Sequence, residues 1–111
     1  MSLFDFLKKR QVFTVNEGIN RSREENGILL DVRRKEDFKK GHVAGAQNAP
    51  IDSLEHTAKT RLRELDQPIY IIGSYSDRPE NAVKILRKLG YTNVYQSGYM
   101  EEHQGLLKKT K

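Results

Sequence analysis

Residues 69–90 read IYIIGSYSDRPENAVKILRKLG and predict a strand, a loop and a helix in direct succession. The apolar run at residues 69–72 follows a proline and is typical of a strand that is buried on both faces of a sheet. A helix is expected over residues 78–89, because one of its faces is apolar and Gly90 ends it. Such a junction directs backbone N–H groups and a helix N-terminus at one point, which predicts an anion-binding loop.

Apolar runs and helical patterns alternate on both sides of this stretch. Further strands are expected at 11–15, 28–32 and 93–96, and further helices at 16–26, 35–40 and 53–65. The first helix is expected to begin at a capping Asn16 and is weakened by Gly18, and Gly41 is expected to end the second as a left-handed cap. This order, in a chain of 111 residues, indicates one α/β domain built on a mostly parallel sheet.

The positive charge of the chain is concentrated at its two ends. The formal net charge is +5, of which residues 1–10 carry +2 and residues 106–111 carry +3, while residues 11–105 sum to zero. A nucleic-acid-binding protein gathers its basic residues on one folded face, so no nucleic acid is expected as a partner. Solubilising ends are the favoured interpretation, and binding of a polyanion or a membrane surface through these ends stays open as an alternative.

We expect three parts: a basic, amphipathic N-terminal segment at 1–10, a domain at 11–105 and a basic tail at 106–111. The N-terminal segment is too short and too charged for a secretory signal, and its apolar residues Leu3, Phe4 and Leu7 are expected to dock on the domain. No run approaches the ~20 apolar residues that span a bilayer. The expected location is cytoplasmic, without integral membrane association.

Two motifs stand out in the domain. The first runs from Leu29-Leu30-Asp31-Val32-Arg33 through Phe38 to GHVAGAQNAP at residues 41–50, and the second is the strand, loop and helix that end in KLGYTNVY at residues 88–95. Together they resemble the single-domain rhodaneses, a family of sulfurtransferases, over the whole domain. The resemblance implies a rhodanese-like, three-layer α/β fold with a mainly parallel, roughly five-stranded sheet, helices on both faces, and the loop at the carboxyl edge of the sheet.

The usual nucleophile of that family is missing. In the family the loop reads Cys, two residues, Gly, one residue, Arg, and the cysteine carries sulfur as a persulfide. Registering the loop on Arg78 places Gly73 at the cysteine position and Ser76 at the glycine position, and the chain contains no cysteine. A shift of one residue brings Ser74 to the cysteine position, but a serine cannot hold sulfane sulfur as a persulfide. No catalytic residue is assigned.

The candidate binding loop still contains several polar groups, and the resemblance implies that two further residues lie beside the loop and support it. It comprises Gly73, Ser74, Tyr75, Ser76, Asp77 and Arg78, with Asp31 and Arg33 as supporting residues. Asp77 and Glu80 are expected to cap the helix, which disfavours an external anion. Arg78 either holds an anion or pairs with Asp77, Glu80 or Asp31.

Aromatic residues and a histidine complete the candidate region. Tyr75 either fills the pocket or stands on its rim as a contact for a partner protein, where Tyr99 and Met100 extend an aromatic surface. His42 resembles the family's structural histidine, bonded to nearby backbone. No second histidine at ligand spacing supports a metal site, and no cofactor is expected.

These observations predict a rhodanese-like domain that is inactive as a thiosulfate sulfurtransferase and acts as a binding or regulatory module, a pseudoenzyme. Another protein is the expected partner, with a small anion at the loop as a further possibility. The alternative is a sulfurtransferase-related enzyme activity in which a partner supplies the thiol and this chain supplies the anion cradle. Sulfate or thiosulfate bound by the amides of residues 74–78 would favour that alternative, and a cradle filled by the side chains of Asp77 or Tyr75 would count against it.

Overall fold

The computed structural model describes residues 11–110. The docking expected of Leu3, Phe4 and Leu7 therefore lies outside the described residues. Within the described part, no helix is long and apolar enough to cross a membrane.

Four parallel strands form the central sheet. They are β1 (Ile28–Asp31), β2 (Gln47–Asn48), β3 (Ile69–Gly73) and β4 (Val94–Tyr99), in the order β2-β1-β3-β4. Among the described residues, the strand expected at 11–15 is reduced to a parallel bridge between Val12 and Gln96, beside which the Phe13 N–H donates to the Gln96 carbonyl at 2.8 Å. The sheet thus has four strands and one bridged edge segment instead of five strands.

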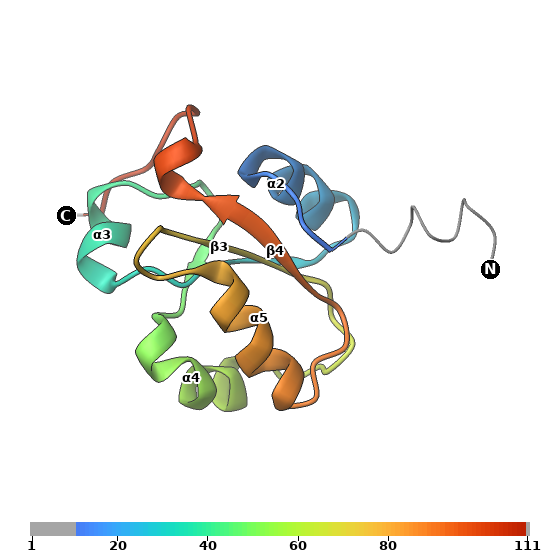
Figure 1. The fold of residues 1–111 in the computed structure, drawn as a ribbon. Helices are drawn as coiled ribbons and strands as arrows, with labels where there is room; N and C mark the ends of the chain where they lie inside the picture. Colours follow the sequence, from blue (N-terminus) through green and yellow to red (C-terminus); the bar gives the residue numbers. More distant parts are fainter. Residues whose placement is uncertain (1–10, 111) are drawn as a thin grey trace.

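Helices cover both faces of this sheet. They are α2 (Val15–Glu24), α3 (Lys35–Lys40), α4 (Leu54–Arg61) and α5 (Pro79–Lys88), together with the 3-10 helices η1 (Ile51–Ser53) and η2 (Met100–Glu102). Figure 1 shows α2 on one side of β3 and β4 and both α4 and α5 on the other. The predicted three-layer α/β architecture is confirmed.

Alternation along the strands divides the core between the two faces. Ile28, Leu30, Ile69 and Ile71 pack in the cluster that contains the buried residues of α4 and α5. Leu29, Tyr70 and Ile72 point to the opposite face and pack with Phe13 and Val15. Because β1 and β3 are buried on both faces, both read as unbroken apolar runs in the sequence.

Several predicted helix ends are wrong in detail. Thr14, not Asn16, caps α2: its side-chain oxygen accepts from the Glu17 N–H at 3.1 Å, while the Glu17 carboxylate accepts from the Thr14 N–H at 3.0 Å. Gly41 has φ 173°, so the chain leaves α3 in an extended conformation and not through a left-handed cap. The helix expected over 53–65 is η1 followed by the shorter α4.

Gly18 has a packing role that explains its place inside α2. A Cβ at this position would lie 1.7 Å from Oγ of Ser97 in β4. The missing side chain therefore allows the helix to approach the sheet closely, at the small cost in helix propensity that glycine carries.

Candidate functional site

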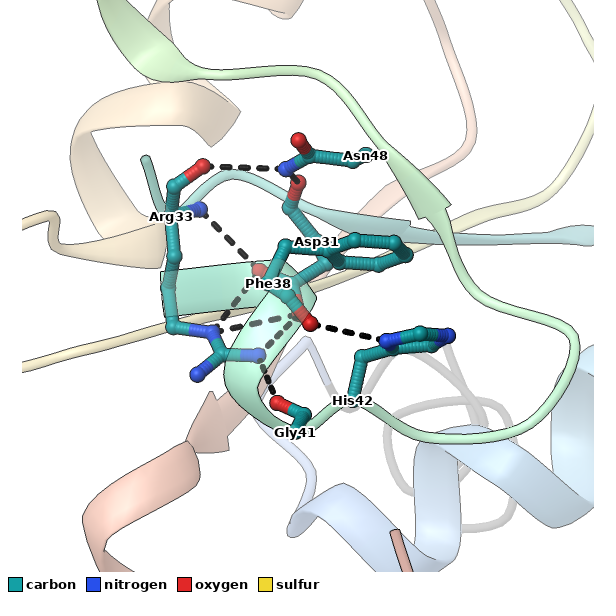
Figure 2. A network of polar contacts seen from close by, with 6 residues as sticks. All are labelled: Asp31, Arg33, Phe38, Gly41, His42 and Asn48. Atoms are coloured by element: carbon teal, nitrogen blue, oxygen red, sulfur yellow. Dashed lines mark hydrogen bonds and ion pairs between the residues drawn. The ribbon is translucent and has the colours of Figure 1, made fainter. Parts of the chain in front are cut away.

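A buried ion pair between Asp31 and Arg33 lies at the carboxyl end of β1. The Arg33 guanidinium donates from Nη2 to Asp31 Oδ2 at 2.8 Å and from Nε to Oδ1 at 3.0 Å, and the Arg33 N–H donates to Oδ1 at 3.0 Å. Asp31 is fully buried, and Arg33 is 8% exposed. Nη2 also donates to the Gly41 carbonyl at 2.7 Å, so the pair fixes the segment after α3 (Figure 2).

Neighbouring side chains extend this network along the same edge of the sheet. The Asn48 amide donates to the carbonyls of Asp31 and Arg33 at 3.0 and 2.9 Å, which ties β2 to the end of β1 (Figure 2). His42 Nδ1 donates to the Phe38 carbonyl at 2.8 Å, and its ring stacks on that of Phe38 with centroids 3.8 Å apart. These contacts hold His42 in its place and match the structural histidine that the resemblance implied.

Residues 108–110 lie against this edge. The backbone N–H groups of His42 and Lys108 donate to each other's carbonyls at 2.9 and 2.8 Å, and the Thr110 N–H donates to the Lys39 carbonyl at 2.9 Å. Residues 108–110 are thus bound to the end of α3 and the residue that follows Gly41.

The loop between β3 and α5 is closed by its own groups. The Ser74 N–H donates to the Asp77 carbonyl at 3.0 Å, and the Asp77 N–H donates to Ser74 Oγ at 2.8 Å. The hydroxyl oxygens of Ser74 and Ser76 lie 3.3 Å apart. Two of the amides expected to cradle an anion, those of Ser74 and Asp77, are therefore already engaged within the loop.

No room exists for a side chain at Gly73, where the resemblance implies the position of the family's cysteine. A Cβ there would lie 2.3 Å from the Asp77 carbonyl oxygen, 2.8 Å from Pro79 Cδ and 2.9 Å from Pro79 N. The nearest obstacles are backbone atoms and a proline ring, which cannot turn aside as a flexible side chain would. Glycine at this position and the tight closure of the loop thus depend on each other.

Two carboxylates from η2 reach the loop from outside. The Glu101 carboxylate accepts from the Tyr75 N–H at 2.9 Å, and the Glu102 carboxylate accepts from the Tyr75 hydroxyl at 2.8 Å. The bond to Glu102 raises the pKa of the Tyr75 phenol. Glu101 thus provides a negative group on a loop amide where the anion-binding interpretation expects an external ligand.

Arg78 pairs with Glu80, one of the alternatives left open by the sequence. Arg78 Nη1 lies 3.3 Å from Glu80 Oε2, and its guanidinium lies 5.9 Å from the ring centroid of Tyr99. The Tyr99 hydroxyl donates to the same Glu80 oxygen at 2.8 Å. Burial opposes ionisation of Glu80, but hydrogen bonds from its own N–H, from Tyr99 and from Arg78 lower its pKa.

The predicted capping of α5 by acidic side chains is wrong. Arg78 is the N-cap residue, and no side chain makes a capping hydrogen bond there. Asp77 Oδ2 and Glu80 Oε1 are buried and have no hydrogen-bond partner among the described residues. Pro79 at the start of the helix lowers the need for a cap because it has no N–H.

A hollow of about 430 Å³ joins the loop to the edge of the sheet. The loop contributes Ser74 and Ser76, the ion pair contributes Arg33, and α3 contributes Asp37 and Lys40. Met100, Glu101 and Leu107 close the opposite side. Ser74, Ser76 and Arg33 are therefore brought together as predicted, while Arg78 points toward Tyr99 and does not line this hollow.

Sequence reasoning missed several participants. Glu101 and Glu102 follow Tyr99-Met100 directly, but nothing in their spacing to the loop indicates that they reach Tyr75. Leu107 lies in a tail that only its charge singled out. Asn48 differs from these residues, because it lies within the motif at residues 41–50 that carries the resemblance.

Comparisons with known proteins identify the family to which this chain is similar. Residues 14–101 match the family of the rhodanese-like domain. The uncharacterized protein YqhL of Bacillus subtilis is 32% identical over 105 residues, which cover 94% of this chain and 82% of YqhL. The thiosulfate sulfurtransferase GlpE of Pseudomonas fluorescens is 26% identical over 73 residues, which cover 66% of this chain and 65% of GlpE.

A solved structure shares the fold. The Alr3790 protein from Anabaena sp. superimposes with a TM-score of 0.70 at 28% identity, over 83% of this chain and 88% of that chain. The region matched by the family extends from the cap of α2 beyond the end of β4, so it contains the whole sheet and the loop after β3. Although it has no cysteine to place on that loop, the chain belongs to the rhodanese-like domain family.

Proposed function

We propose that this chain is a binding or regulatory module without thiosulfate sulfurtransferase activity. The observation that carries the proposal is the closure of the loop at Gly73, where a Cβ would lie 2.3 Å from the Asp77 carbonyl oxygen. A chain without cysteine lacks the thiolate that accepts sulfur, and here the space for that side chain is also occupied. The sheet and helices around the loop nevertheless keep the fold of the rhodanese-like domain.

The state of the loop amides supports a non-catalytic role. Internal bonds engage the amides of Ser74 and Asp77, and the Glu101 carboxylate engages that of Tyr75. A small anion would compete with these acceptors for the same donors. The alternative of sulfur transfer assisted by a partner thiol needs amides that are free to hold the sulfur donor, so these contacts count against it.

Another protein is the partner that the exposed part of the site favours. Tyr75 is 49% exposed although it is a large ring in a short loop, and its neighbours Tyr99 and Met100 are partly exposed. Tyrosines at the rim of a rigid site are frequent contact residues in protein interfaces, because they supply area at low cost in conformational entropy.

A photo-cross-linking residue at position 75 tests the binding role. Leu65 is a matched control position, since it is 51% exposed and precedes β3, at the opposite edge of the sheet. We expect a discrete cross-linked product in the native host from position 75 and none of the same mass from position 65. Equal labelling from both positions, or no product from position 75, would contradict a partner at the loop. The catalytic half of the proposal predicts no sulfur transfer from thiosulfate to cyanide.

A further inference from the structure

Tyr75, Glu80, Tyr99, Glu101 and Glu102 form one surface across the loop, the start of α5 and η2, which we call the aromatic–acidic surface. The tyrosine rings lie 5.3 Å apart between centroids, at an interplanar angle of 41°. The hydroxyl of Tyr75 donates to Glu102 and that of Tyr99 donates to Glu80. Each ring is therefore held in place with a carboxylate at its edge.

Resting on the binding role proposed above, we infer that the aromatic–acidic surface recognises an arginine-bearing segment of a partner protein. Ring faces attract cations, and carboxylates match the fork of N–H donors on a guanidinium. A surface that presents both groups side by side therefore fits arginine better than it fits an anion or a purely apolar segment.

Arg78 of the chain itself shows how this surface receives a guanidinium. Its guanidinium lies over the ring of Tyr99 at 5.9 Å and pairs with Glu80 at 3.3 Å. The Arg78 side chain is 50% exposed. The ring of Tyr75, which is 49% exposed, offers a second and similar place beside Glu102.

Local charge supports the same chemistry. Counting Asp77 and Arg78 together with the three glutamates, this region has a formal charge of −3 on a chain whose net charge is +5. Such a local excess attracts a basic segment and disfavours an acidic one.

A hollow next to the surface provides room for the apolar part of such a segment. It measures about 440 Å³, and its lining includes Val15, Gly98, Tyr99 and Glu102. An arginine places its aliphatic stem on apolar atoms while its head group binds a charge. The hollow and the carboxylates are thus arranged for one amphipathic, cationic ligand.

Peptide binding tests this inference. The probe is a fluorescein-labelled peptide of four Gly-Arg repeats, and its control contains citrulline, which has nearly the shape of arginine without the charge. Binding is measured by fluorescence anisotropy on the full chain at low and at physiological salt. We expect the arginine peptide to bind and the citrulline peptide to bind at least tenfold more weakly, with affinity that falls as salt rises.

Charge-matched variants locate the binding. The double variant Glu80→Gln/Glu102→Gln removes two charges from the aromatic–acidic surface, and we expect it to weaken arginine-peptide binding about tenfold. Glu24→Gln/Glu64→Gln removes two charges from exposed residues that precede β1 and β3, at the opposite edge of the sheet, and is expected to change binding less than twofold. Thermal unfolding confirms that each variant is folded.

The outcomes separate this inference from the proposed function. Equal binding of the two peptides, equal weakening by the two double variants, or no arginine-peptide binding up to about 1 mM would overturn the inference. A discrete cross-linked partner at position 75 alongside any of these results would leave the binding role intact and exclude arginine as the group recognised.

Discussion

The backbone N–H of Tyr75 donates to the carboxylate of Glu101 at 2.9 Å, and this bond couples the loop after β3 to η2. In Glu101→Ala, the Tyr75 amide loses its charged acceptor, so we expect faster hydrogen exchange at residues 74–77 and new binding of sulfate by the loop. Amide NMR shifts during a sulfate titration measure both effects. Glu102→Ala is the control, because it removes the acceptor of the Tyr75 hydroxyl and leaves the amide bonded. Sulfate shifts of equal size in wild type and Glu101→Ala would contradict a blocked loop.

Restoring a cysteine at position 73 is expected to fail. In Gly73→Cys the new Cβ meets the Asp77 carbonyl and the Pro79 ring, so the loop must shift. We expect a loss of about 1–3 kcal/mol in the free energy of unfolding, as for other overpacked sites, and no gain of sulfur transfer. Urea unfolding measures the first effect. Ser76→Cys is the matched control, since that residue is exposed and should accept the thiol without loss of stability.

The ion pair of Asp31 and Arg33 is expected to be a main support of the site edge. Asp31→Ala leaves the Arg33 guanidinium buried without its carboxylate, which typically costs about 3–5 kcal/mol. The exposed pair of Arg34 and Asp37, 3.6 Å apart, gives the comparison: Asp37→Ala should cost less than about 1 kcal/mol. Chemical denaturation of both variants decides the point. Similar losses would show that burial of the Asp31 pair has no special weight.

Tyr70 predicts a sensitivity to alkali. Burial first, and then the hydrogen bond to Glu25, raise the pKa of Tyr70 to about 12 from an ordinary 10.0. Because the folded state favours the protonated phenol, its contribution to stability is complete below pH 10 and is lost as the pH rises from 10 toward 12. Tyr70→Phe should therefore lose less stability than wild type over that interval, as followed by circular dichroism. A Tyr70→Phe slope equal to that of wild type would refute the assignment.

Strands with continuous burial were the most predictable part of this fold. Ile28–Asp31 and Ile69–Gly73 are buried at every residue, so their apolar runs revealed them directly. β2 has two residues, one of them exposed. It was not predicted, because so short a segment shows no alternation of apolar and polar residues. The segment near Val12 was predicted as a strand, and within residues 11–110 it forms a bridge to Gln96.

The site was predictable where it depends on local sequence and not where it depends on tertiary contacts. The resemblance carried by two short motifs implied that Arg33 lies beside the loop, and Arg33 lines the same hollow as Ser74 and Ser76. Glu101 reaches Tyr75 across 26 positions of sequence, and Leu107 reaches Gly41 from a tail that carries no apolar pattern. Glu80 was expected to cap α5, but its carboxylate accepts from Arg78 and from the Tyr99 hydroxyl, and Tyr99 lies 19 positions away in the sequence.

Cyanide-dependent formation of thiocyanate from thiosulfate tests the central claim most directly. Wild type and Gly73→Cys are assayed beside a protein-free blank and a cysteine-containing rhodanese, over a range of protein concentration. We predict rates equal to the blank for both forms: wild type has no sulfur nucleophile, and in Gly73→Cys the closed loop leaves no working position for the added thiol. A wild-type rate above the blank that rises in proportion to protein concentration would contradict the account.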